Sequence, residues 1–533
     1  MSATPPPPPP SHTGKDPHPR RWAAAVVMMI AALMDLLDAT IVNVAIPSIG
    51  RDLHASSSEL QWTVSAYLLG FAAALIVSGH LGDRLGRRTL FLAGTAGFGL
   101  AGLACGLAQS PGQLIAARAV QGILAAVLVP QVIGSFRTLF QGRERGAAFG
   151  MYGAVAGFAS AIGLLLGGVL TDADLFGWGW RSVFLVNVPV AAATLVAGAL
   201  LVPATKERSA GRPDVIGSLV LAGALVAIVL PLVQGRESGW PLWGWACLAT
   251  GLLSVAALAV FEARRHGEGT VPLLPARAFR LPAFSVGVLV QLLFSVGMQG
   301  FFLVFAVWLQ AGQGYTPMQA GVVTVAFSVG SFLTAPAADA LAVRYGRLVL
   351  GAGALLMAAG FGWVWAAIGD ASDTHTGAWP LAPGLTVAGA GLGFLVVPLV
   401  NVVLSAVPAD LAGGASGIFS TAQQFGGALG AAVIGTVFFG HADHGLTPAL
   451  GTAMPWVTGG FVLCAVLCAM LPRTATSDAS EPSDVSEPSD VSEPSVRSEP
   501  TGVSEPSVRS EPTGVSEPSV RSEPAVPSGP SGP

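Results

Sequence analysis

The chain has 533 residues, of which 52% are hydrophobic and only 11% are charged. Soluble domains carry about 25% charged residues, so this composition excludes an ordinary soluble protein and predicts many helices that cross a membrane. The net charge of −4 provides no basic surface that would indicate a nucleic-acid partner.

In chain order, the sequence begins with a polar, proline-containing segment, residues 1–20, which is expected to be disordered. No cleavable signal peptide is expected, because the next apolar run continues to the full length of a membrane span. Fourteen apolar segments of that length follow. Their approximate ranges are 23–47, 60–79, 89–108, 113–136, 146–170, 182–202, 214–234, 241–261, 282–308, 318–338, 348–368, 382–405, 413–439 and 454–472.

The first apolar segment contains Asp35 and Asp38, within LMDLLDATIVNVAIP at 33–47. On a helix these residues lie about 60° apart and roughly 4–5 Å apart along the axis, so both can face one cavity. Arg118, in the fourth segment, lies at a depth from which it can approach Asp38. An ionisable residue at mid-membrane costs several kcal/mol unless it is paired or hydrated. Either Arg118 and one acid form a pair that fixes helix register, or the acid left without an arginine carries a coupled proton.

A link rich in glycine and arginine, GHLGDRLGRR at 79–88, joins the second and third segments. By itself it reads as a basic inner loop with a tight turn. A second copy, LAVRYGR at 341–347, has Val343 in place of the acid. Two copies predict two related halves of six spans, with the seventh and eighth segments inserted between them. The residues expected to act at an inner gate are Gly79, Asp83, Arg84, Gly86, Arg87 and Arg88.

Basic residues predict the orientation. With the N-terminus inside, lysines and arginines cluster in the inner links, whereas the outer links carry only Arg51, Arg181 and Arg236. Because inner loops of membrane proteins are rich in these residues, we expect a plasma-membrane protein with both termini in the cytoplasm.

The segments group into five expected regions. The two six-helix bundles cover 21–202 and 282–473, the two-helix insert and inner linker cover 203–281, and tails cover 1–20 and 474–533. In the second tail, Ser-Glu-Pro recurs every six residues from Ser480 to Pro524. A hexapeptide β-helix has this period, but proline in every turn would remove hydrogen-bond donors from the ladder, so disorder is favoured.

Polar and aromatic side chains on the apolar segments are candidates for a substrate cavity, and interhelical hydrogen bonds or core packing are the alternative for each. The candidates are Asn43, Trp62, Tyr67, Gln121 and Gln299, and Asn187 is a further polar residue of this kind. The four cysteines show no metal-ligand spacing, and GxxxxGK[ST] is absent from the sequence. We therefore expect no cofactor, no enzymatic activity and no direct use of ATP.

Six stretches together carry a family resemblance. GHLGDRLGRR resembles the signature loop of the major facilitator superfamily, and LLDATIVNVAIPSI at 36–49 resembles the first-span signature of its fourteen-span drug:proton antiporter family. Four further stretches are similar to that family, namely 60–69, 116–130, 180–189 and 413–430. The resemblance implies an all-α fold of two six-helix bundles plus two inserted helices, and it marks Asp38 as the family position.

One departure concerns the fifth segment, where such exporters usually carry a Gly-Pro pair followed by two glycines. Here GLLLGG at 163–168 keeps Gly163, Gly167 and Gly168 but has Leu164 in place of the proline. Gly163 and Gly167 still form a small-xxx-small face that favours close helix packing.

The function that the resemblance implies is proton-coupled efflux of an organic compound, a drug or antibiotic that is cationic or lipophilic. The expected partners are that substrate, protons and the lipid bilayer, with the protein a monomer. Three alternatives stay open: a proton-coupled importer of a small organic solute on the same fold, a narrow self-resistance exporter for one secreted antibiotic in place of a broad multidrug pump, and a membrane sensor or scaffold that transports nothing.

Overall fold

The computed structural model describes residues 20–204, 215–235, 238–264, 276–369, 379–408 and 411–471, and every regular element within them is a helix. The predicted tails at 1–20 and 474–533, apart from Arg20, lie outside this range. The long helices are α1 (Arg21–Leu53), α2 (Ser57–Leu85), α3 (Arg87–Gly106), α4 (Pro111–Leu139), α5 (Gly142–Asp172), α7 (Asn187–Leu201), α8 (Val215–Gln234), α9 (Leu242–Arg264), α11 (Pro282–Val307), α12 (Pro317–Tyr345), α13 (Arg347–Gly369), α14 (Ala382–Ser405), α15 (Ala412–Gly440) and α16 (Leu446–Met470).

Each predicted apolar segment falls on one of these long helices, the sixth on α7 together with the short elements that precede it. Those elements are η2 (Gly179–Arg181) and α6 (Ser182–Leu185). Within the described residues, twelve helical spans are long and apolar enough to cross a membrane. The chain is therefore a multi-pass membrane protein. The other short elements are η1 (Leu175–Gly177), α10 (Ala276–Phe279), η3 (Trp308–Gly312) and η4 (Ala442–His444).

The second helix of each half begins in the same way. Ser56 accepts from the backbone N–H of Glu59 (3.3 Å), whose carboxylate accepts from the Ser56 N–H (2.8 Å). Thr316 and Gln319 form the same capping box at the start of α12, with distances of 3.2 and 3.0 Å. These reciprocal bonds satisfy backbone donors that the first turn of a helix leaves free.

These two helices also end in the same way, at a glycine with positive φ. Gly86 (φ 98°) separates α2 from α3, and Gly346 (φ 55°) separates α12 from α13. The repeated sequence LGDRLGR and LAVRYGR thus encodes a repeated local structure, because only glycine adopts such φ values without strain.

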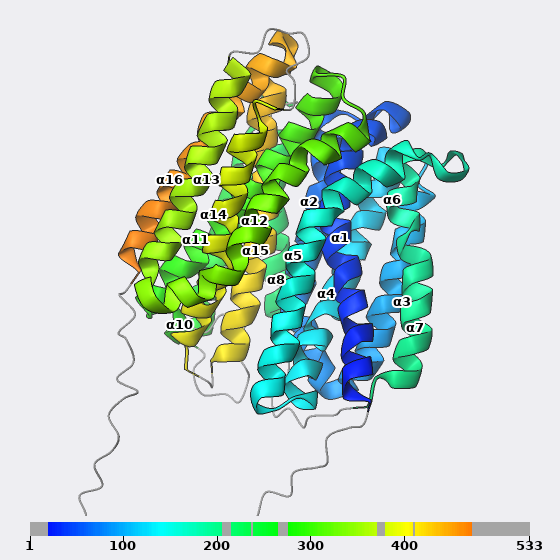
Figure 1. Cartoon of the computed structure of the whole chain (residues 1–533), viewed down its shortest axis with the longest axis vertical. Coiled ribbons are helices and arrows are strands. Elements are labelled where there is room, and N and C mark those ends of the chain that lie inside the picture. The colour runs from blue at the N-terminus through cyan, green and yellow to red at the C-terminus, as the bar shows by residue number, and fades with distance from the viewer. Residues whose placement is uncertain are drawn as a thin grey trace, which may run out of the picture. The chain divides into compact units, whose positions relative to one another are not determined.

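Helix packing repeats between the halves. In the first half α2 and α3 pack against α4, and α1 packs against α5; in the second half α12 and α13 pack against α14, and α11 packs against α15 (Figure 1). α8 packs against α2 and α15, one helix from each half, and Thr436 of α15 donates to the Leu232 carbonyl of α8 (2.7 Å).

The halves meet mainly through α5 with α12 and α2 with α15, and α1 also contacts α11 and α12. Figure 1 shows α5 and α12 side by side. The α5–α12 and α2–α15 pairs are equivalent under the repeat, since α2 corresponds to α12 and α5 corresponds to α15. α1, which carries both acids, contacts its repeat-related counterpart α11.

Candidate functional site

Asp38 is the centre of a buried polar network on α1, with 1% of its surface exposed. Its Oδ2 accepts from Arg118 Nη1 of α4 at 2.5 Å. Its Oδ1 accepts from Gln121 Nε2 of α4 and from Asn187 Nδ2 of α7, both at 2.9 Å. A buried carboxylate is stable only when a cation and further donors replace the water it has lost, and all three donors are present here.

Arg118 is equally well satisfied. Besides Asp38, its Nη1 donates to Gln121 Oε1 (2.8 Å) and its Nε donates to the Thr63 carbonyl of α2 (3.2 Å). The guanidinium carbon lies 4.1 Å from the centre of the Tyr67 ring, an arrangement that stabilises a desolvated cation. Arg118 therefore ties α1, α2 and α4 together around one charge pair.

Asp35 lies one turn before Asp38 on α1 and has a different environment. It is 7% exposed, and its Oδ1 accepts a hydrogen bond from the Tyr67 hydroxyl. Within the part of the chain that the structure describes, no arginine or lysine pairs with it. The single arginine of the region thus neutralises Asp38, and Asp35 is the acid that is left without a cation.

The five residues expected at a substrate cavity divide between two places. Gln121 and Tyr67 belong to the acid network. Asn43 and Gln299 instead join the halves, because Gln299 Nε2 of α11 donates to Asn43 Oδ1 of α1 (2.9 Å). Trp62 is half-buried, and among the described residues its Nε1 has no hydrogen-bond partner.

A cavity of about 380 Å³ lies away from all five of these residues. It is at the end of the bundle where α1 ends, here named the Leu53 end, and is lined by residues that include Arg51, Asp52, Asp172 and Arg181.

At the Leu53 end, the two halves are in contact and are joined by hydrogen bonds. This contact between the halves, of which α5 and α12 form part, is named the seam. Asp172, at the end of α5, accepts from the Met318 N–H in the first turn of α12 (3.0 Å). Gln310 Nε2 donates to the Val44 carbonyl (2.7 Å). Asn43 and Gln299, which are bonded to each other, also lie on the side of the acids that faces the Leu53 end. These hydrogen bonds join α1 and α5 of the first half to α11, η3 and α12 of the second.

The glycines of α5 allow this helix to approach both neighbours. An added Cβ on Gly163 would overlap the Thr40 hydroxyl of α1, and one on Gly167 would lie 2.8 Å from the Ile41 carbonyl. Gly168 faces α12 instead, where an added Cβ would lie 2.5 Å from the Pro317 carbonyl. α5 is one continuous helix through Leu164, so the departure from the Gly-Pro pattern leaves a helix in close contact with α1 and α12.

The inner link differs from the expectation in its extent. Residues 79–85 continue α2, and Gly86 alone separates α2 from α3, because the segment lacks the proline that would break the helix. The surroundings of Gly79 and the side chains of Asp83 and Arg84 lie outside the described part of the structure. Their role at an inner gate stays a prediction.

The two arginines after Gly86 hold α3 against its neighbours. Arg88 Nη2 donates to the Ala199 carbonyl at the end of α7 (2.6 Å). The Arg87 guanidinium packs against Gly134 of α4, where any added Cβ would overlap it.

Sequence reasoning did not assign two partners. Asn187 was recognised as polar but not as a ligand of Asp38, although it lies in the WRSVFLVNVP stretch that carries part of the resemblance. Asp172 gave no signal, since its partner is a backbone N–H of a helix more than a hundred positions away.

Comparison with known proteins gives the same family that the sequence motifs resemble. The model of the Major Facilitator Superfamily matches residues 28–431. The probable actinorhodin transporter of Streptomyces coelicolor is 39% identical over 80% of this chain and 74% of its own length. The puromycin resistance protein of Streptomyces alboniger is 37% identical over 87% of this chain and 94% of its own length. The tetracenomycin C resistance and export protein of Streptomyces glaucescens is 35% identical, with 78% and 76% covered.

Solved structures share the fold at low sequence identity. A D-xylose–proton symporter superposes with a TM-score of 0.63 at 16% identity, covering 85% of this chain and 99% of its own. A bacterial homologue of the human drug peptide transporters gives a TM-score of 0.61 at 16% identity, with 85% and 98% covered. The repeated helix packing, the family match and these relatives agree, and the chain belongs to the Major Facilitator Superfamily.

Proposed function

We propose that this protein exports an organic antibiotic or drug across the plasma membrane in exchange for protons. The observation that carries the proposal is the unequal pair of buried acids on α1, of which only Asp38 has an arginine partner. The named activities of the Streptomyces relatives, export of or resistance to antibiotics, support the substrate class.

In this proposal Asp35 carries the proton and the Asp38–Arg118 pair provides a fixed charge beside it. Protonated Asp35 disfavours the substrate; once the proton has left toward the cytoplasm, the free carboxylate favours it, most strongly if the substrate is a cation. The two halves then rock about the central site in alternating access. The protein acts as a monomer.

The proposal includes a membrane topology. All fourteen long helices span the bilayer, α2 and α5 included, the bundles cover 21–202 and 282–473, and both termini lie in the cytoplasm. The Leu53 end then faces outward, and the motif with Asp83 and Arg84 acts at the inner gate. The basic inner links of the sequence support this orientation.

The seam between α5 and α12 is the outer gate in this topology, and it offers a direct test. Gly168→Ala places a Cβ against the Pro317 carbonyl, so we expect the closed form to be disfavoured by about tenfold. The reporter is Thr324→Cys, a buried position in the wall between α1, α5, α11 and α12, with the four native cysteines replaced. Its labelling by a membrane-impermeant maleimide from outside should accelerate accordingly.

Gly459→Ala is the matched control for the gate variant, because an added Cβ there meets nothing within 4 Å. Equal labelling rates in the two variants would mean that the α5–α12 seam does not gate the outer side.

The function itself is tested in inverted membrane vesicles that are energised to be acidic inside. We expect them to accumulate puromycin, actinorhodin or the lipophilic cation tetraphenylphosphonium, with accumulation abolished by an uncoupler. Accumulation by right-side-out vesicles only would identify an importer. Vesicles that move no compound of a broad panel in either direction would favour a sensor or scaffold.

A further inference from the structure

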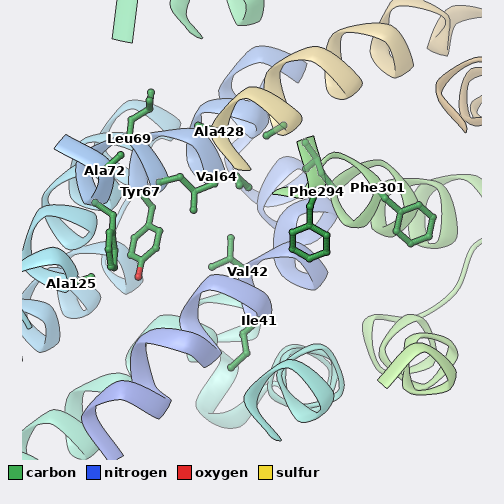
Figure 2. Packing of buried hydrophobic residues seen from close by; sticks show 14 of the residues in the cluster. Ile41, Val42, Val64, Tyr67, Leu69, Ala72, Ala125, Phe294, Phe301 and Ala428 are labelled. Atoms are coloured by element: carbon green, nitrogen blue, oxygen red, sulfur yellow. The ribbon is translucent and has the colours of Figure 1, made fainter. Parts of the chain in front are cut away.

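Tyr67 of α2 touches both halves of the acid network. Its hydroxyl donates to Asp35, while its ring lies under the guanidinium of Arg118, which pairs with Asp38. Figure 2 shows Tyr67 projecting from α2 with its hydroxyl directed toward α1. One side chain therefore joins the acid that lacks a cation to the ion pair beside it.

The position of this ring is closely held. Tyr67 is 1% exposed, and its backbone carbonyl lies against Gly122 of α4, where any added Cβ would overlap it. This contact holds the α2 backbone at Tyr67 close against α4, and so fixes the point from which the ring projects. In the conformation described, Tyr67 is thus part of the packed network.

The phenol group suits both protonation states of a carboxyl group. A hydroxyl can donate to a carboxylate, and it can accept from a protonated acid. The bond to the carboxylate is the stronger of the two, because one partner is charged. Tyr67 can therefore keep Asp35 in place through a cycle of proton binding and release, while favouring the ionised form.

We infer that Tyr67 is a positioning residue for proton coupling, which holds Asp35 beside the Asp38–Arg118 pair in both protonation states. The inference rests on the proposed function and reassigns Tyr67 from substrate contact to the proton site. Within the described residues, the titratable and charged groups that act on Asp35 are Asp38, Tyr67 and Arg118, and Asp35 in turn acts on Tyr152 of α5.

Tyr67→Phe tests the hydroxyl alone, because the ring stays under Arg118. Loss of the hydrogen bond removes a group that stabilises the carboxylate. We expect the midpoint of the pH dependence of efflux to move upward by about one pH unit. Efflux at the most favourable pH should stay within about threefold of the wild type, since the packing is unchanged.

Tyr345→Phe is the matched control, because Tyr345 is 49% exposed and removing its hydroxyl leaves the acid network intact. A second measurement combines Tyr67→Phe with Asp35→Asn and follows the downhill exchange of labelled for unlabelled substrate across the pH range, an activity that needs no proton and is expected to survive in Asp35→Asn. If Tyr67 acts through Asp35, the hydroxyl deletion should cause no further change in the double variant. A wild-type pH midpoint in Tyr67→Phe, or additive effects in the double variant, would overturn the inference. Absence of proton-driven efflux from the wild type would instead reject the proposed function.

Discussion

Asp35→Asn is expected to abolish proton-driven efflux while leaving the protein folded. Asparagine has nearly the same shape as aspartate, and its Oδ1 can still accept from the Tyr67 hydroxyl that contacts Asp35. No cation loses its partner, because Arg118 pairs with Asp38. The change in unfolding free energy should therefore stay within about 1 kcal/mol, whereas accumulation in energised vesicles falls to that of vesicles without the protein.

The measurement compares initial rates at which inverted vesicles accumulate a compound that the wild type exports, across the pH range and with matched amounts of protein. Asp443→Asn is the control, because Asp443 is an exposed acid in η4, distant in sequence and structure from the network. Downhill exchange of labelled for unlabelled substrate should survive in Asp35→Asn, since it requires no proton. Undiminished accumulation with an unchanged pH dependence would exclude Asp35 as the proton carrier.

Arg118→Gln is expected to have the largest effect on stability. It leaves the Asp38 carboxylate buried at 1% exposure with only the amides of Gln121 and Asn187 as donors. Removing one partner of a buried ion pair typically costs about 3–5 kcal/mol, because the remaining charge is uncompensated. Thermal unfolding of the purified protein in detergent should show a clearly lowered midpoint. The membrane should also contain little folded protein.

The double variant Arg118→Gln with Asp38→Asn distinguishes a structural pair from a functional one. Because both charges are gone, most of the lost stability should return. A pair that only fixes helix register would then allow wild-type efflux. Our account predicts a stable protein whose efflux has an altered pH dependence, since Asp35 no longer titrates beside fixed charges. An Arg118→Gln protein as stable as the wild type would contradict the role given to the pair.

The helices and the acid region were predictable because their signals are local. Apolar runs of span length gave the helix positions, and the three-residue spacing of Asp35 and Asp38 placed both acids on neighbouring faces of α1. The same spacing argument did not determine which of the two acids forms the ion pair with Arg118. The pairing depends on two other helices, because α7 brings Asn187 to Asp38 and α2 brings Tyr67 to Asp35.

Other features depend on long-range packing, which a single sequence does not encode in a readable form. The seam at the Leu53 end involves Asp172 and Met318, and neither belongs to a motif. The link at 79–88 looked like a loop because it is polar, yet α2 continues through most of it. The helix ends only at Gly86, where the backbone adopts a positive φ. Composition indicated the polarity of that segment but not its conformation.

The central claim is that Asp35 binds the exchanged proton in competition with the substrate. The most direct test is the release of protons from purified protein in weakly buffered detergent, when a compound that the wild type exports is added. The account predicts proton release from the wild type, and none from Asp35→Asn even at compound concentrations high enough to saturate its weaker binding. Equal proton release from Asp35→Asn and the wild type would contradict it.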